Sequence, residues 1–135
     1  DQLRSVTMPP KRFELVEKAG ITFVNDSYNA NVSSFKAAME NLPKGTRLVG
    51  VLGSMGELGQ FSRACHDEVA KAAEELFDEL LYIGDDWKDV IKQQETLYSS
   101  FDILQTTLAK ILQPGDVVLI KGSNYHKLWR LLDLV

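Results

Sequence analysis

Hydrophobic residues fall into short runs, separated by stretches in which apolar positions recur at helical spacing. Four runs rich in aliphatic, β-branched and aromatic residues predict buried strands, at residues 21–24, 48–52, 80–83 and 117–120. A weaker run within 96–101 predicts a short edge strand. All are far shorter than the roughly 18–20 apolar residues that a membrane-spanning helix needs, so no membrane insertion is expected.

Between the strands, apolar residues at intervals of three and four predict helices. They are expected at residues 33–42, 87–94 and 104–112, with a closing helix that runs through Leu128, Leu131 and Leu132. A longer helix follows a glycine-rich segment and carries the apolar stripe Phe61, Cys65, Val69, Ala72 and Leu76. Strands that alternate with helices predict an α/β domain, with a Rossmann-like, mostly parallel sheet flanked by helices.

Ligands of such sheets bind beyond the carboxyl ends of the strands. This rule selects three loops, 25–31, 53–59 and 121–124, which should lie along one edge of the domain. The first loop reads Asn25-Asp26-Ser27-Tyr28-Asn29-Ala30-Asn31. Helix capping would use one or two of these polar side chains, whereas a binding role would account for their number.

The other two loops each allow two interpretations. Glycines at G-x-x-G-x-x-G spacing in loop 53–59 fit either a phosphate cradle or a plain tight turn, and match neither the dinucleotide fingerprint nor the Walker A sequence. Glu57 within it would repel a phosphate, unless it faces a cation or an ammonium group. In the third loop, Lys121 could form a surface salt bridge, or could bind a carboxylate together with Gly122 and Ser123.

Composition narrows the class of protein. The length of 135 residues suits one domain, and 15 basic against 19 acidic residues leave a net charge of -4, which argues against a nucleic-acid partner.

The single cysteine, Cys65, fits a reducing cytosol, so a cytoplasmic location is expected. Cys65 and His66 are adjacent on a helix and project about 100° apart, so they do not predict a metal site. Because the chain begins at Asp1 without a methionine, we expect it to be a piece of a longer protein.

Four stretches resemble the C-terminal domain of the Mur ligases, the ATP-dependent amide-forming enzymes of peptidoglycan synthesis. They are Arg12-Phe13-Glu14 after a proline-containing linker, residues 25–31, residues 52–59 with His66 downstream, and Gly115-Asp116 leading into Lys121-Gly122-Ser123. These stretches span nearly the whole chain in the order of the family. The strings D-S-Y-N-A-N and G-x-M-x-E-L-G resemble the branch that adds D-Ala-D-Ala to UDP-MurNAc-tripeptide through an acyl phosphate.

The resemblance implies a linker at residues 1–12 and a Mur ligase C-terminal domain at 13–135, without the N-terminal and central ATPase domains. In that family the central domain carries the P-loop and most magnesium ligands, so this chain alone is expected to be inactive. ATP and Mg²⁺ would serve the intact enzyme, with D-Ala-D-Ala and UDP-MurNAc-tripeptide as its substrates. The chain would be a monomer that packs against its own missing domains.

The resemblance also implies residue roles. Arg12 would be catalytic and reach the ATP phosphates, and Asp26 would bind the ribose hydroxyls. The same cofactor-binding cleft would be lined by Tyr28, Asn29 and Asn31. The incoming D-Ala-D-Ala would be held near its carboxylate by Lys121, Gly122 and Ser123, with Glu57 and His66 as further substrate-binding residues. No residue of this chain is expected to bind a metal.

Two other functions stay open. One is a Mur-type ligase that adds a different amino acid, against which the first loop argues. The other is a non-catalytic, Rossmann-like nucleotide-binding domain. Such a domain would bind its ligand tightly by itself, whereas half of an interdomain cleft would bind weakly.

Overall fold

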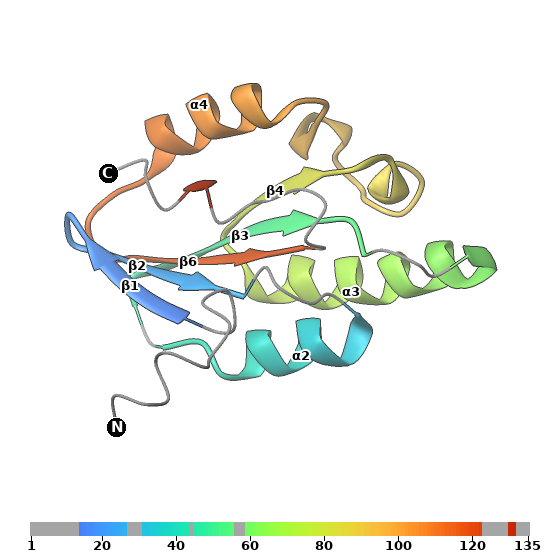
Figure 1. The fold of residues 1–135 in the computed structure, drawn as a ribbon, viewed down its shortest axis with the longest axis horizontal. Coiled ribbons are helices and arrows are strands. Elements are labelled where there is room, and N and C mark those ends of the chain that lie inside the picture. Colours follow the sequence, from blue (N-terminus) through green and yellow to red (C-terminus); the bar gives the residue numbers. More distant parts are fainter. Residues whose placement is uncertain (1–13, 27–30, 44, 56–58, 123–129, 132–135) are drawn as a thin grey trace.

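A computed structural model describes residues 14–26, 31–43, 45–55, 59–122 and 130–131. The described part of the chain contains a six-stranded sheet with the order β1-β2-β6-β3-β4-β5 (Figure 1). The strands are β1 (Glu14–Lys18), β2 (Ile21–Asn25), β3 (Arg47–Gly53), β4 (Glu79–Ile83), β5 (Leu97–Tyr98) and β6 (Asp116–Lys121). All neighbours are parallel except β1 and β2, so the predicted α/β, mostly parallel sheet is confirmed.

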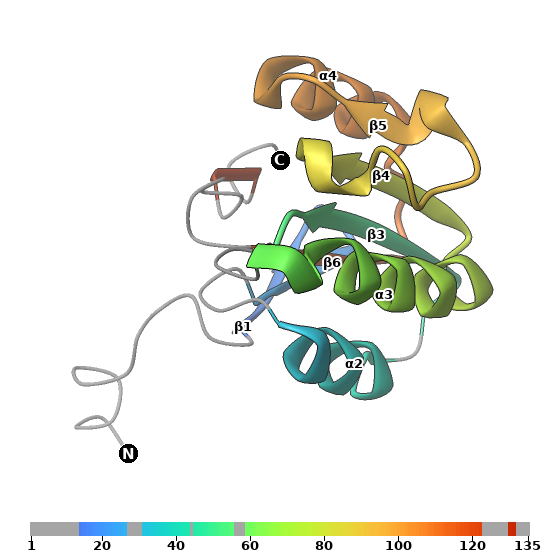
Figure 2. The same ribbon diagram turned by 90° about the vertical axis from the view of Figure 1, so that its right-hand side faces the viewer.

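In the described residues, three α-helices cover the two faces of this sheet. The helices α2 (Val32–Glu40) and α3 (Ser62–Leu76) lie on one face, and α4 (Phe101–Ile111) lies on the other (Figures 1 and 2). Side chains alternate between the faces along each strand, so Leu52 belongs to the core under α2 and α3, and Val51 to the core under α4. Two hydrophobic cores therefore hold the sheet rigidly from both sides.

The antiparallel strand β1 was not anticipated from the sequence. It joins β2 through a two-residue turn in which Ala19 (φ 54°) and Gly20 (φ 80°) both have left-handed backbone conformations. Such turns match the twist of a hairpin and favour glycine. The sequence pattern does not predict this strand, because charged residues interrupt its apolar ones and Leu15 is exposed.

The helix predicted at 87–94 is wrong. This segment holds two short 3-10 turns instead, η2 (Asp85–Trp87) and η3 (Gln94–Thr96). A single helical turn brings Trp87 and Ile91 into the core, and the Gln94 side-chain amide then donates to the carbonyl of Ile91 at 3.2 Å. The chain then turns back to form β5, the predicted edge strand in a shorter form.

The apolar stripe predicted for the long helix is partly wrong. Phe61 and Leu76 at its two ends are 63% and 37% exposed. The buried residues of α3 are His66, Val69, Ala70 and Ala73. The true inner face is thus rotated by about one residue, because a histidine counted as polar occupies a core position.

The predicted linker at 1–12 lies outside the described residues, as does most of the predicted closing helix, although Leu131 is buried in the core under α4. Within the described part of the chain, none of the helices has the length and apolar character needed to cross a membrane.

Candidate functional site

The carboxyl ends of β2, β6 and β3 lie next to one another in the sheet. Asn25 is level with Ile120 of β6, and Leu52 of β3 is level with Lys121. The described residues of the three predicted loops therefore share one edge, as the sequence predicted. We call Asp26, Lys121 and Gly122 at this edge, together with Ser54 and Met55, the carboxyl-edge cluster.

The centre of this cluster is an ion pair between residues 95 positions apart. The Lys121 ammonium donates to Asp26 Oδ2 at 2.9 Å and to the Asp26 backbone carbonyl at 3.2 Å. The Asp26 backbone N–H in turn donates to the carbonyl of Ile120 at 2.9 Å. These bonds join the end of β2 to the end of β6, and they bring together two residues that the resemblance had assigned to different ligands.

Lys121 is fully buried, and its ammonium also lies 5.4 Å from the centre of the Phe35 ring on α2. Burial lowers the pKa of Lys121, and the hydrogen bond and charge of Asp26 oppose that shift. A buried ammonium is costly unless it is paired, so Asp26 is what allows this lysine to stay charged inside the domain.

Asp26 contacts Lys121 on one side and a surface pocket on the other. Its side chain is 16% exposed, and it lines a surface pocket of about 490 Å³ beside α2 that also touches Ser34 and Asn41. The carboxylate can therefore contact a ligand in this pocket while Lys121 fixes its position. Carboxylates at the ends of parallel strands commonly accept hydrogen bonds from ligand hydroxyls.

Asn31 caps helix α2. Its side-chain oxygen accepts from the Ser34 N–H at 2.8 Å, and the Ser34 hydroxyl accepts from the Asn31 N–H at 2.9 Å, which completes a capping box. The structure thus shows a capping role for Asn31, which uses its side-chain oxygen.

His66 is held on both sides of its ring. Its Nδ1 donates to the Ser62 carbonyl at 2.7 Å, and its Nε2 accepts from the Met55 N–H at 3.0 Å. Only the neutral ring with its proton on Nδ1 makes both bonds. Burial lowers the pKa of His66 in the same sense, against the Ser62 carbonyl and the Asp86 carboxylate, which raise it. His66, fully buried, fixes the loop after β3.

The backbone amides at the start of that loop are already used. Ser54 N–H donates to the Ile83 carbonyl at 3.1 Å and Met55 N–H donates to His66. The described part of loop 53–59 therefore forms a braced turn, and these two amides do not face an anion. The buried Ser54 hydroxyl has no hydrogen-bond partner among the described residues.

Several predicted site residues lie outside the described residues, namely Arg12, Tyr28, Asn29, Glu57 and Ser123. Gly122 is described and buried directly after β6. Sequence reasoning missed Phe35 beneath Lys121, and Ser62, which donates to Asp86 at 3.1 Å beside His66. The signal for Ser62 was its position four residues before His66 on one helix face.

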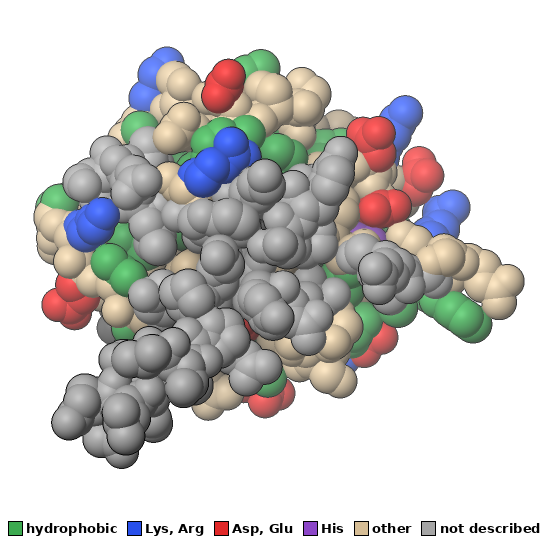
Figure 3. Space-filling model, viewed as in Figure 1, with side chains coloured by type: hydrophobic (Ala, Val, Ile, Leu, Met, Phe, Trp, Pro, Cys, Tyr) green, Lys and Arg blue, Asp and Glu red, His purple; other side chains and the backbone are tan. Residues whose placement is uncertain are grey.

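Charged side chains of both signs are interspersed over the described surface that Figure 3 shows, without a basic stripe on that face. Among the residues that can be described, no group of three or more His, Cys, Asp or Glu is placed to hold a metal ion.

The His66 bonds predict a pH effect on stability. We expect His66→Gln to lower the free energy of unfolding at pH 7.5 by about 1–3 kcal/mol, because an amide oxygen can still accept from the Met55 N–H but the Ser62 carbonyl loses its donor and Trp87 loses the imidazole ring that packs against it. The folded-state pKa of His66 is below its unfolded value near 6.5, so its contribution is present above about pH 6.5 and is lost as the pH falls through the folded-state pKa. Urea unfolding between pH 7.5 and 5 should show this loss in the parent chain and not in His66→Gln.

The matched control is His126→Gln, since the chain has two histidines. This control should keep the pH dependence that depends on His66. Equal pH slopes for the parent and His66→Gln would contradict the neutral, buried state of His66.

Comparisons with known proteins agree with this geometry. The family model described as Mur ligase, glutamate ligase domain, matches residues 11–124. UDP-N-acetylmuramoyl-tripeptide--D-alanyl-D-alanine ligases from Borreliella burgdorferi and Treponema pallidum are 31% and 33% identical over 91% and 94% of this chain. The chain spans only 29% and 30% of their lengths.

Among solved structures, the MurF ligase from Thermotoga maritima in complex with ADP superposes with a TM-score of 0.78 at 26% identity. The match covers 94% of this chain and 30% of that one.

Proposed function

This chain belongs to the family of Mur ligase C-terminal domains, and we propose that it is that domain of an ATP-dependent ligase that adds D-Ala-D-Ala to UDP-MurNAc-tripeptide. The observation that carries the proposal is the similarity to ligases of that name over nearly the whole chain. The amide bond would form in the cell-wall precursor. ATP would phosphorylate the tripeptide carboxylate, and the D-Ala-D-Ala amine would then displace the phosphate.

Asp26 is the described residue that best fits a nucleotide. Its carboxylate lines the pocket beside α2, where a carboxylate suits ribose hydroxyls as an acceptor, and its Oδ2 is bonded to Lys121. In this proposal ATP supplies the phosphoryl group, and the domain orients the nucleotide. Arg12, Tyr28, Asn29 and Asn31 are proposed for the same cleft, with Arg12 reaching the phosphates.

Lys121 is proposed to act as a positioning residue. Its ammonium is enclosed and bonded to Asp26, so it holds the cleft wall in place and sets where Gly122 and Ser123 meet the incoming dipeptide. His66 acts in the same way on the loop that contains Glu57. Most of the catalytic contribution of such a domain is orientation of the reactants.

Further parts of the proposal concern the intact protein. Mg²⁺ is proposed to bind on the central domain and not on this chain. A cytoplasmic location and a monomer that closes over its own domains are proposed because UDP-linked precursors and ATP are its substrates. The net charge of -4 supports small-molecule partners over nucleic acid.

Amine specificity of the full-length parent tests the proposal. ADP release is measured with UDP-MurNAc-tripeptide and, separately, D-Ala-D-Ala, D-Glu, L-Lys and diaminopimelate. We expect turnover with D-Ala-D-Ala alone, and none from the isolated 135-residue chain, whose sequence has no Walker A motif. Turnover with another amine would assign a different Mur-type ligase. A parent inactive with every amine, combined with tight ATP binding by the isolated chain, would favour the nucleotide-binding domain.

A further inference from the structure

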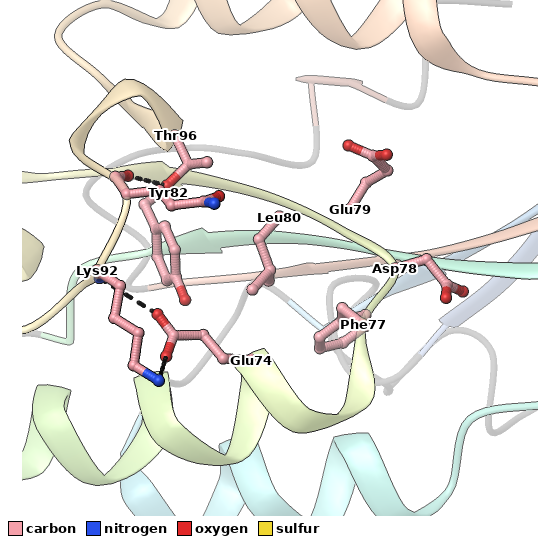
Figure 4. A pocket seen from close by; sticks show the side chains of 9 residues that line it. Glu74, Phe77, Asp78, Glu79, Leu80, Tyr82, Lys92 and Thr96 are labelled. Atoms are coloured by element: carbon pink, nitrogen blue, oxygen red, sulfur yellow. Dashed lines mark hydrogen bonds and ion pairs between the residues drawn. The ribbon is translucent and has the colours of Figure 1, made fainter.

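A pocket of about 340 Å³ opens between the end of α3, strand β4 and the turns before β5 (Figure 4). None of its lining residues belongs to the carboxyl-edge cluster. Phe77 and Leu80 supply apolar walls, and Glu74, Lys92 and Gln93 supply polar groups. The volume lies within the range typical of small-molecule sites.

Tyr82 gives this pocket an unsatisfied polar group. The residue is 1% exposed, and its hydroxyl has no hydrogen-bond partner in the described part of the chain. Its ring lines the pocket and its hydroxyl points down from β4 toward Glu74 on α3 (Figure 4). Burial, and then the charge of Glu74, raise the pKa of Tyr82, so the hydroxyl keeps its proton and remains a donor without an acceptor.

The charged side chains around the pocket favour a neutral ligand over an ionic one. The Glu74 carboxylate lies 4.0 Å from the Lys92 ammonium and accepts from the Lys92 backbone N–H at 3.4 Å. The Glu74 and Lys92 charges therefore offset each other at the rim. Of the two other carboxylates in the lining, Asp78 accepts from the Leu48 backbone N–H at 2.8 Å and Glu79 points to the opposite side of β4 (Figure 4). A cation would meet Lys92, and an anion would meet Glu74.

We propose that this pocket is a second binding site, for a small neutral molecule that carries a hydroxyl group on an apolar body. The ligand hydroxyl accepts a hydrogen bond from Tyr82 and donates one to Glu74, which an ammonium or a carboxylate cannot both do. The apolar body packs against Phe77, Leu80 and the Tyr82 ring. The site is independent of the ligase proposal, because it needs none of the residues of the carboxyl-edge cluster.

Benzyl alcohol is the probe, with toluene, benzylamine and benzoate as analogues that lack the hydroxyl or carry a charge. Amide chemical shifts of the isotope-labelled 135-residue chain report binding residue by residue. We expect benzyl alcohol to shift residues 74–82 and 92–96 with a Kd in the millimolar range, which suits about eight heavy atoms. Each analogue should bind at least about fivefold more weakly, the scale of one lost hydrogen bond.

Two variants separate the hydroxyl contact from the cavity itself. Tyr82→Phe removes the unpartnered hydroxyl and keeps the ring, so it should fold and lose about fivefold or more in benzyl alcohol affinity, with toluene binding unchanged. Glu74→Gln should weaken benzyl alcohol more mildly, because an amide oxygen still accepts. Tyr98→Phe on β5 and Glu75→Gln, the exposed neighbour on α3, are the matched controls and should bind as the parent does.

The proposal is overturned if benzyl alcohol and toluene bind equally, if Tyr82→Phe binds benzyl alcohol as well as the parent, or if no shifts appear around the pocket. Preferential binding of benzylamine would also overturn it, because the pocket would then select a cation.

Discussion

Replacing Asp26 with alanine is expected to lower the free energy of unfolding of this domain by about 3–5 kcal/mol at pH 7. The substitution leaves the Lys121 ammonium without its carboxylate partner, at a position where the lysine side chain has no exposure to solvent. Lys121 could instead release its proton. At about 1.36 kcal/mol per pKa unit below 10.4, deprotonating Lys121 at pH 7 costs roughly 4–5 kcal/mol. The expected loss of stability is therefore similar whether the buried lysine stays charged or becomes neutral.

The pH dependence identifies the cause. With its folded-state pKa lowered further, Lys121 is protonated mainly in the unfolded chain, so the stability of Asp26→Ala should rise with pH up to about 10.4, more steeply than that of the parent. Denaturant unfolding at pH 7 and pH 9.5 measures this. Adding Lys121→Met to Asp26→Ala should recover much of the lost stability, since the buried charge is gone.

Asp89→Ala, at an exposed turn position, is the matched control and should change stability by less than about 0.5 kcal/mol. A loss below about 1 kcal/mol for Asp26→Ala, or no recovery in the double variant, would show that Lys121 does not depend on Asp26.

Replacing Arg47 with methionine is expected to lower the free energy of unfolding by a similar amount, about 3–5 kcal/mol. Arg47 begins β3 and its partner Asp116 begins β6, so this pair lies at the amino ends of the strands, opposite the carboxyl-edge cluster. Arg47 Nε and Nη2 donate to the two carboxylate oxygens of the buried Asp116 at 3.0 and 2.8 Å, and Nη2 also donates to the Ile111 carbonyl at 2.5 Å. Such a forked pair ties β3, β6 and the end of α4 together. Methionine fills the space but leaves Asp116 charged and buried, with the Gln113 N–H as the remaining partner of its side chain among the described residues.

Lowering the pH should reduce the stability difference between Arg47→Met and the parent. Burial raises the pKa of Asp116, but the Arg47 hydrogen bond, the Gln113 N–H and the Arg47 charge outweigh it and lower the pKa overall. In the parent, the stability from Asp116 is therefore present above about pH 4 and is lost as the pH falls through the folded-state pKa. Without Arg47, Asp116 takes up a proton at higher pH, and the difference between variant and parent should shrink between pH 7 and pH 4.

Thermal or urea unfolding at both pH values gives the comparison, with Arg63→Met as the matched control on the exposed surface of α3. A deficit of Arg47→Met that stays constant with pH would contradict an uncompensated Asp116 charge as its cause.

Local sequence patterns decide much of this protein. The runs at 21–24, 48–52, 80–83 and 117–120 are strands, and the segments 33–42 and 104–112 are helices, because their periodicity matches one secondary structure and their ends carry glycine, proline or capping residues. Alternation of strand and helix then places the polar loops at one edge. The family resemblance was also available from these loops alone, and the family is confirmed.

Only the tertiary structure decided which side chains meet. Asp26 and Lys121 pair across 95 positions because β6 inserts between β2 and β3, an order that no local pattern specifies. His66 faces inward because the Met55 backbone N–H, which lies outside its helix, donates to its ring, and this bond allows a polar residue to occupy a core position. The segment after Trp87 does not form the helix that its periodicity predicts, and its Trp87 and Ile91 side chains are buried in the core, so local propensity alone does not decide its structure. Sequence thus determined most of the elements, with β1 and the segment 87–94 as the exceptions, and the edge that carries the site. Long-range pairing determined the partners, because the energy of a buried polar group depends on what surrounds it.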